Sequence, residues 1–160
     1  MTIGEYNRCV DDYSDGLYRF LLKNLKDEEV AKDLVQESFL RLWTRRKDID
    51  PQKSKSYLFT VGYHASIDHI RKFSRMEVFT EKHESKAVQI SYSDAGEVLE
   101  KAVELLPEDQ KAVLMLRDYE GYSYKEIGDI TGLTESQVKV YIFRARLFLK
   151  KYIVDPDYVL

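Results

Sequence analysis

Residues 122–151 read YSYKEIGDITGLTESQVKVYIFRARLFLKK, and this stretch decides the fold of the C-terminal half. Two helix starts are visible, because Ser123 with Glu126 and Thr134 with Gln137 both fit the capping box. In that motif a hydroxyl and an acid or amide side chain satisfy the free N–H groups of a first helical turn. Gly132 stands where the first helix must end and the chain reverse, a position that favours positive φ. The stretch therefore predicts two short helices around a tight turn.

The second of these helices has two different faces. Four apolar residues recur at helical spacing and predict a stripe that faces the core: Val138, Ile142, Ala145 and Leu149. The rest of its surface is basic, with no acid from Ser136 to Lys151. A capped helix, a glycine turn and a basic helix are typical of a helix-turn-helix whose second helix enters the DNA major groove. On these residues alone, a helical hairpin with a solvated basic face remains the alternative.

Composition limits the class of protein. A chain of 160 residues can form one ordinary domain or two small ones, and 44% hydrophobic residues are enough for packed cores. The net charge of −3 argues against binding nucleic acid by bulk attraction, although bases cluster at residues 53–75 and in the C-terminal helix. With no long apolar run and no signal-peptide features in MTIGEYNRCVDD, we expect a cytoplasmic protein.

Enzyme chemistry finds little support in the sequence. Cys9 is the only cysteine, which excludes a disulfide framework and a cysteine-rich zinc site. The chain has no HExxH, CxxC, glycine-rich phosphate loop or nucleophile elbow, and its three histidines lack the spacing of metal ligands. We therefore expect no catalytic residue, no metal, no cofactor and no small-molecule substrate.

Helical periodicity extends over most of the chain and predicts an all-α fold. Residues 3–25 form one amphipathic pattern, Asp27 can cap a second helix, and Asp50 followed by Pro51 can start a third that reaches about Arg75. The period is lost from about 76 to 94, where a polar stretch this long indicates a linker rather than a loop inside one domain. We expect two small helical domains, residues 1–75 and 95–160, joined by a flexible linker at 76–94, with the helix-turn-helix in the second.

Three segments, in this order, resemble the extracytoplasmic-function (ECF) class of RNA polymerase sigma factors of the sigma-70 family. DLVQESFLRLW at residues 33–43 is similar to the family's polymerase-binding helix. YLFTVGYHASIDHIRK at 57–72 is similar to its helix for recognising and melting the −10 element, and LPEDQ at 106–110 with the helix-turn-helix is similar to its −35 domain. The resemblance covers nearly the whole chain and implies a sigma factor that binds core polymerase and opens promoter DNA without catalysing a reaction.

The resemblance also implies site residues. It implies polymerase contacts, chiefly with the clamp coiled coil, from Asp33, Gln36, Glu37, Phe39, Leu42 and Trp43, while the flap would be a second polymerase contact of the chain. It implies −10 contacts from a mixture of bases and aromatics suited to phosphates and unstacked bases: Lys53, Lys55, Tyr63, His64, Arg71, Lys72 and Arg75. It implies −35 contacts from Ser136, Gln137, Lys139, Val140, Phe143 and Arg144.

Departures from the family pattern bear on specificity. Relatives commonly place Asn at the position of His64, a small polar residue at Val140 and a basic one at Tyr141, so we expect different −10 and −35 preferences. The family also implies an anti-sigma factor, which can hold the chain at the membrane. The rival interpretation is a helix-turn-helix transcriptional regulator that acts without polymerase, but such a protein has no need of the segments at 33–43 and 57–72.

Overall fold

The N-terminal domain consists of three helices, and side chains close in sequence cap the start of each one or of the turn that leads into it. This computed structural model describes the backbone of residues 1–77 and 95–154 and the side chains of residues 1–74 and 96–154. Helix α1 (Ile3–Leu25) begins with a capping box formed by Thr2 and Glu5. Helix α2 (Glu28–Thr44) begins where Asp27 accepts hydrogen bonds from two backbone N–H groups. A 3-10 turn, η1 (Pro51–Lys53), capped by Asp50, leads into α3 (Ser54–Glu77).

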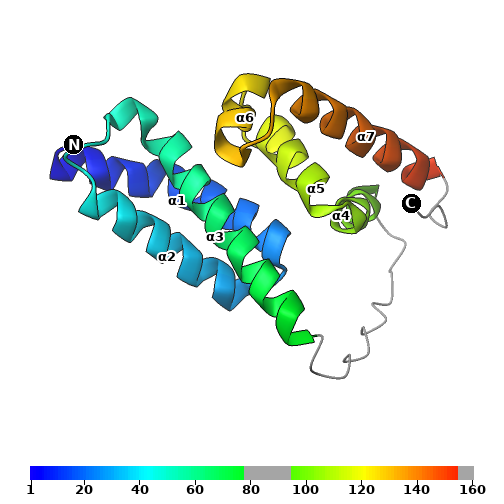
Figure 1. The fold of residues 1–160 in the computed structure, drawn as a ribbon, viewed down its shortest axis with the longest axis horizontal. Helices are drawn as coiled ribbons and strands as arrows, with labels where there is room; N and C mark the ends of the chain where they lie inside the picture. The colour runs from blue at the N-terminus through cyan, green and yellow to red at the C-terminus, as the bar shows by residue number, and fades with distance from the viewer. Residues whose placement is uncertain (78–94, 155–160) are drawn as a thin grey trace.

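The three helices pack as a bundle around large apolar side chains (Figure 1). Leu17, Phe20 and Leu21 of α1 are fully buried with Leu42 of α2 and Leu58 of α3. Helices α1 and α3 approach closely at Gly62, where an added Cβ would lie 3.0 Å from Leu17 Cδ1. Cys9 is buried in the same bundle, with its Sγ 3.2 Å from Ser54 Oγ. The three helices predicted for this half are confirmed.

The C-terminal domain contains the helix-turn-helix. Helices α4 (Ala95–Leu105) and α5 (Glu108–Leu114) are followed by a π-helical turn, η2 (Met115–Tyr119), and then by α6 (Tyr124–Thr131) and α7 (Glu135–Val154). Both predicted capping boxes form, at Ser123 and Glu126 and at Thr134 and Gln137. Gly132 adopts φ 81°, as its place in the turn requires. The core stripe on α7 is also confirmed, since Val138, Ile142 and Ala145 are buried and Leu149 is half-buried.

The turn between α6 and α7 is tight enough to need a second glycine. A Cβ on Gly128 would lie 2.8 Å from the carbonyl oxygen of Leu133, a backbone atom that cannot move away alone. Every helix and turn of residues 1–77 and 95–154 agrees with the predicted all-α class. Helix α3 continues to Glu77, and the remainder of the predicted linker, residues 78–94, lies outside the described residues.

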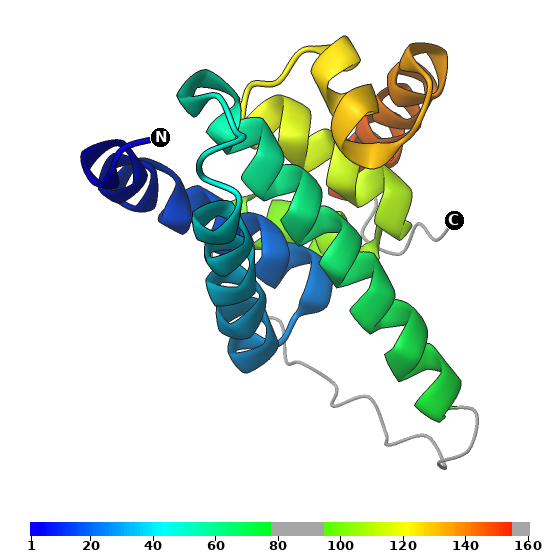
Figure 2. The same ribbon diagram turned by 60° about the vertical axis from the view of Figure 1, so that its left-hand side comes forward.

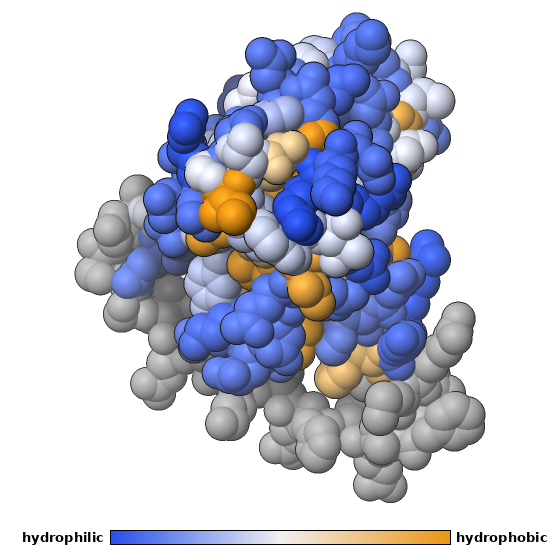
Figure 3. All heavy atoms as spheres, turned by 90° about the vertical axis from the view of Figure 1, so that its left-hand side faces the viewer, coloured by the Kyte–Doolittle hydropathy of each residue, from blue (hydrophilic) through white to orange (hydrophobic). Residues whose placement is uncertain are grey.

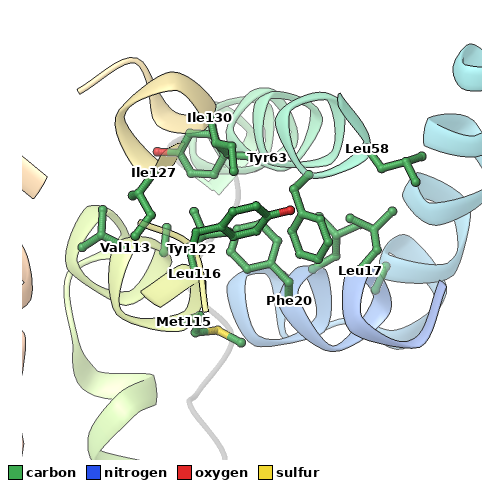
Figure 4. Close-up of a cluster of buried hydrophobic side chains, with 14 of the residues drawn as sticks. Leu17, Phe20, Leu58, Tyr63, Val113, Met115, Leu116, Tyr122, Ile127 and Ile130 are labelled. Carbon is green, nitrogen blue, oxygen red and sulfur yellow. The ribbon is translucent and has the colours of Figure 1, made fainter. Parts of the chain in front are cut away.

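The two domains share a hydrophobic core. Tyr122, Ile127 and Ile130 of the C-terminal domain belong to the same buried cluster as Phe59 and Tyr63 of α3. Figure 4 shows Tyr122 between the helices of the two domains, close to Phe20 and Tyr63, and the Tyr122 and Phe59 ring centroids are 5.8 Å apart. Helix α6 is thereby packed on α3, while α7 runs away from the N-terminal domain (Figures 1 and 2).

Charged groups connect the domains around this core. The side chain of Glu120 is 8% exposed and lies 3.9 Å from both the Lys55 ammonium and the Arg19 guanidinium. It also lies against Gly16, where an added Cβ would meet its carboxylate oxygen at 3.1 Å. On the neighbouring side of α1, Lys23 lies 3.8 Å from Glu100 of α4. The described structure is therefore a closed arrangement of two domains.

Candidate nucleic-acid and protein interfaces

The predicted polymerase-binding face on α2 is exposed and acidic. Asp33 and Gln36 are exposed, and Glu37 is half-buried and accepts a 2.7 Å hydrogen bond from Arg41 one turn on. These acids and the amide lie at i, i+3 and i+4, so the helix brings them to one face. The structure thus brings the polar part of the predicted set together.

The apolar part of that set lies elsewhere. Phe39 and Leu42 are buried in the bundle, so in this arrangement they support α2 rather than form its surface. Trp43 is half-buried, with its ring 4.9 Å from that of Tyr6 and the Arg46 guanidinium 3.9 Å above it. Figure 3 shows the face at the left of Figure 1, where patches of hydrophobic atoms lie among hydrophilic ones.

Leu40 is an exposed residue of the predicted polymerase-binding face that sequence reasoning missed. It is 62% exposed and lies three residues from Glu37, four from Gln36 and seven from Asp33, which places it on the acidic face of α2. The signal was present in the sequence, because the core pattern of α2 includes Phe39 and Leu42 but leaves Leu40 on the opposite side. An exposed leucine among acids is suited to contact a partner that is both apolar and basic.

The predicted −10 residues on α3 divide between two faces. His64, Arg71 and Lys72 are exposed and lie at i, i+7 and i+8, so they share the outward face of the helix. Lys53 is exposed in the preceding 3-10 turn η1. Arg75 lies in the last turns of α3, but its side chain is outside the described residues. The outward face therefore carries three of the predicted contacts together.

Lys55 and Tyr63 instead face the C-terminal domain. The Lys55 ammonium lies 3.4 Å from the carbonyl oxygen of Glu120 and 4.8 Å above the ring centroid of Tyr122. Tyr63 is only 5% exposed, and burial with the nearby acids Asp109 and Glu108 raises the pKa of its hydroxyl to about 12. Tyr63 is therefore not available to DNA in this closed arrangement, and the Lys55 ammonium is engaged with Glu120 although its side chain is 32% exposed.

The predicted −35 surface on α7 is open. Ser136, Val140, Phe143 and Arg144 are exposed and share the face opposite the core stripe. Lys139 lies at the edge of that face, with its ammonium 3.7 Å from Glu135 and 5.7 Å from the ring centroid of Tyr124. Gln137 is exposed but occupied, since its side-chain oxygen accepts the backbone N–H of Thr134 at 2.9 Å. Its capping role therefore competes with the base reading expected from sequence.

Within residues 1–77 and 95–154, no group of three or more His, Cys, Asp or Glu side chains is arranged to hold a metal ion. No helix there has the length and apolar character that crossing a membrane requires.

Comparison with known proteins assigns both domains. Residues 9–76 match the family model for sigma-70 region 2, and residues 96–149 match that for sigma-70 region 4. The chain is 33% identical over 159 residues to the ECF RNA polymerase sigma factor SigM of Bacillus subtilis (strain 168), covering 94% of each chain. It is 28% identical over 153 residues to the RNA polymerase sigma factor SigV of the same strain, covering 93% of this chain and 91% of SigV.

Solved structures agree on the fold. The sigma factor RpoE in complex with the anti-sigma factor NepR from Bartonella quintana matches 98% of this chain and 100% of its own, with a TM-score of 0.79 at 22% identity. CnrH in complex with the cytosolic domain of CnrY matches 96% of this chain and 89% of its own, with a TM-score of 0.68 at 22% identity. Together with the predicted helix-turn-helix and the two matched regions, these likenesses show that the chain belongs to the ECF class of RNA polymerase sigma factors, which act as alternative sigma factors in transcription initiation.

Proposed function

We propose that this chain binds core RNA polymerase through α2 and directs it to promoters that carry a −10 element read by α3 and a −35 element read by α7. The observation that carries the proposal is the presence on one chain of an exposed acid–leucine face on α2 and an open basic helix-turn-helix. A regulator that binds DNA alone needs only the second of these features.

The α2 face fits a basic protein element. Asp33 and Glu37 supply charge, Gln36 supplies an amide, and Leu40, about one turn after them on the same face, supplies an exposed apolar side chain. Interfaces gain most of their binding energy from a few central residues that lose contact with water, while rim charges set on-rate and salt dependence. We assign the central role to Leu40 and the steering role to the acids, with the polymerase clamp as the partner and the flap as a second contact elsewhere on the chain.

The outward face of α3 fits the melted −10 region. Arg71 and Lys72 contact phosphates, which gives affinity and salt dependence rather than sequence choice. His64 lies about two turns before them, with its ring 5.6 Å from that of Tyr63, and can stack on or hydrogen-bond an unpaired base. Lys53 extends the basic surface at the start of the helix.

Full −10 contact requires the two domains to separate. In the closed arrangement Tyr63 is buried in the core shared with the C-terminal domain and the Lys55 ammonium is held by Glu120, so both become free for DNA only when the C-terminal domain moves off α3. Binding to polymerase supplies the free energy that separates the domains, because each domain gains its own contact surface on the polymerase. Closure of the free chain then keeps part of the −10 surface away from non-promoter DNA.

The further partner that we propose is an anti-sigma factor. Among the structural relatives, RpoE was solved with the anti-sigma factor NepR and CnrH with the cytosolic domain of CnrY. We place the chain in the bacterial cytoplasm, where it can be held at the membrane by such a factor. It acts by binding and positioning, and no catalytic residue, cofactor or small-molecule substrate is assigned to it.

In vitro transcription with core polymerase from the source bacterium tests the proposal. We expect promoter-specific initiation that depends on the added chain. Initiation at the same sites without the chain, or tight binding to a palindromic DNA site in the absence of polymerase, would support the regulator instead.

A further inference from the structure

A small cavity lies between the two domains, beside the end of α1. Its volume is about 350 Å³, and it is lined by the junction of α1 and α2, the second half of α3, the end of α4 and the start of α5. One turn of an α-helix with its side chains fills on the order of 400–600 Å³, so the cavity is too small for a helix of another protein. Its size is that of a pocket for a small molecule.

Lys111 of α5 is a buried cation that faces this cavity without a partner. It is 3% exposed and belongs to the cavity lining. Its ammonium makes no hydrogen bond and no ion pair within the part of the chain that the structure describes. Burial lowers the pKa of this ammonium to about 8, because its charge has lost water without gaining a comparable contact. An anionic group of a ligand would supply the missing contact.

The charges around the cavity are separated by depth. Lys111 is the buried one, whereas the other charged residues of the lining are exposed and form its rim: Lys26, Asp27, Glu104 and Glu108. Lys26 is already engaged there, since its ammonium lies 3.4 Å from the carbonyl oxygen of Glu104. The rim therefore favours a cation and opposes a plain anion such as phosphate. A ligand with an anionic group inside and a cationic group outside matches both levels.

An apolar wall connects the buried ammonium to the acidic rim. Phe73 of α3 lines the cavity, and its ring plane is 17° from that of His69, with the two ring centroids 6.4 Å apart. Ile70 lies half-buried one turn before Phe73, and Leu106 of the C-terminal domain is 4% exposed on the other side. A short hydrocarbon chain can pack along these side chains.

We propose that this cavity binds a small molecule with a carboxylate at one end, an apolar chain in the middle and an ammonium at the other end. The carboxylate pairs with the Lys111 ammonium, and the chain packs on Phe73 and Leu106. The outer ammonium faces Glu104 and Glu108. Because the N-terminal domain supplies Phe73 and the C-terminal domain supplies Lys111, the complete site exists only in the closed arrangement.

A ligand at this site stabilises the closed arrangement by mass action, since it binds the closed chain and not the separated domains. Its consequence for transcription rests on the proposed function. While the ligand is bound, Tyr63 stays buried and the Lys55 ammonium stays on Glu120, so a smaller fraction of the chain is open for the −10 element. The molecule is an effector and not a substrate.

Three probes of equal chain length test the site. ε-Aminohexanoate carries both charged ends, hexanoate carries only the carboxylate, and hexylamine carries only the ammonium. NMR titration of the full chain measures each affinity, and we expect ε-aminohexanoate to bind most tightly, hexanoate more weakly and hexylamine not measurably. Lys111→Met should weaken binding of ε-aminohexanoate by about ten-fold or more, as for the loss of a charge-assisted hydrogen bond.

Two matched variants control for charge and for the apolar wall. Lys150→Met removes an exposed lysine of α7 outside the lining and should leave the affinity unchanged. Phe73 and Leu105 are 56% and 51% exposed, but only Phe73 lines the cavity, so Phe73→Ala should weaken binding and Leu105→Ala should not. Circular dichroism of each variant checks that the helices still fold.

Several outcomes would overturn the inference: no saturable binding of ε-aminohexanoate, equal affinity of wild type and Lys111→Met, or hexylamine binding as tightly as ε-aminohexanoate. Hexanoate binding as tightly as ε-aminohexanoate would overturn the role of the acidic rim. If ε-aminohexanoate binds through Lys111 but the chain directs no initiation with core polymerase, the cavity site stands and the proposed function fails. Initiation by a chain that does not bind ε-aminohexanoate would have the opposite meaning.

Discussion

The Lys55 ammonium of α3 lies 3.9 Å from the Glu120 carboxylate, which connects the predicted −10 helix to the domain that reads the −35 element. Glu120 is nearly buried and also lies 3.9 Å from Arg19 of α1, so one acid faces two bases of the other domain. A residue expected to contact promoter DNA is thus held by an acid of the same chain. Opening of the domains and release of Lys55 for DNA are therefore one event.

Glu120→Gln should weaken the closed arrangement. The amide keeps the size of the side chain but loses the attraction to Lys55 and Arg19, at a cost of about 1 kcal/mol because both bases keep contact with solvent. Small-angle scattering should then give a larger mean radius of gyration than in wild type. Asp118→Asn is the control, since Asp118 pairs with Arg146 inside the C-terminal domain. Equal radii for both variants and wild type would show that Glu120 does not hold the domains together.

Tyr122→Phe should act in the opposite direction. The Tyr122 hydroxyl is buried between the domains and has no hydrogen-bond partner among the described residues, and burial raises its pKa above the usual range. A buried polar group without a partner costs about 1–3 kcal/mol, so its removal should stabilise the closed form. The ring keeps its contact with Phe59. Hydrogen exchange across residues 59–66 should slow in the variant. Faster exchange there would mean that the hydroxyl stabilises the closed form.

The helix bounds and caps of the fold could be predicted almost completely from the sequence. Helix α1 was expected at residues 3–25 and lies at Ile3–Leu25, and the caps at Asp27, Ser123 and Thr134 form as their side chains predict. These features depend on residues within one turn of each other, which is why the pattern shows them. The closed packing depends on shape complementarity between Tyr122 and α3 and leaves no periodic signal.

The same limit applies to the interfaces. Sequence reasoning grouped Lys55 and Tyr63 with His64 because all three lie on one helix with bases and aromatics, but it could not assign the face that each side chain occupies once the second domain packs on α3. It also assigned Phe39 and Leu42 to a surface by resemblance, whereas Leu40 holds the exposed position between them.

Leu40→Ala should reduce binding to core polymerase without reducing stability. Leu40 is exposed on the acidic face of α2, so its truncation removes partner contact and leaves the bundle core intact. Leu42→Ala should do the reverse and lower the free energy of unfolding by about 2–5 kcal/mol, because Leu42 is fully buried. A pulldown with core polymerase and a thermal melt on both variants distinguish the two roles. Normal polymerase binding by folded Leu40→Ala would remove Leu40 from the interface.

The acids of the same face should act through charge. A double variant with Asp33→Lys and Glu37→Lys should lose core polymerase in the pulldown while keeping its fold, since both residues lie at the surface and the only described ion pair lost is the exposed one between Glu37 and Arg41. Lys32→Glu, at an exposed position next to the acids, is the control for a charge change on α2 that leaves them in place. Retained binding by the folded double variant would exclude this face.

Lys111→Met should change how stability depends on pH. Lys111 is 3% exposed, and burial together with the nearby Lys26 lowers the pKa of its ammonium from 10.5 to about 8. Between about pH 8 and 10 the unfolded chain keeps this proton and the folded chain has lost it, so stability rises with pH in that window. Below it both states are protonated, and the cost of burying the charge remains.

Urea unfolding from neutral pH to about pH 10 measures this contribution. Wild type and the exposed-lysine control Lys150→Met should gain stability as the pH rises, whereas Lys111→Met should start more stable at neutral pH and lack that gain. The Tyr63 hydroxyl, whose pKa is raised from 10.0 to about 12 in the folded chain, begins to ionise in the unfolded chain at the upper end of this range, but this lowers stability equally in all three proteins and leaves their difference unchanged. The same rise in all three proteins would mean that Lys111 is not its source.

Lys139→Ala and Lys150→Ala should separate base reading from phosphate binding on α7. Lys139 lies in the second turn of the helix, beside Tyr124, where a recognition helix is deepest in the groove, so its loss should cost about 1–3 kcal/mol at one base position. Lys150 lies exposed four turns along the helix and can reach only the DNA backbone, so its loss should weaken all sequences alike and reduce the salt dependence. Binding of the polymerase holoenzyme to a promoter and to single-base variants of its −35 element measures both effects. A uniform loss with Lys139→Ala, matching that of Lys150→Ala at every variant, would show that Lys139 binds phosphate and leave Val140, Phe143 and Arg144 to read the sequence.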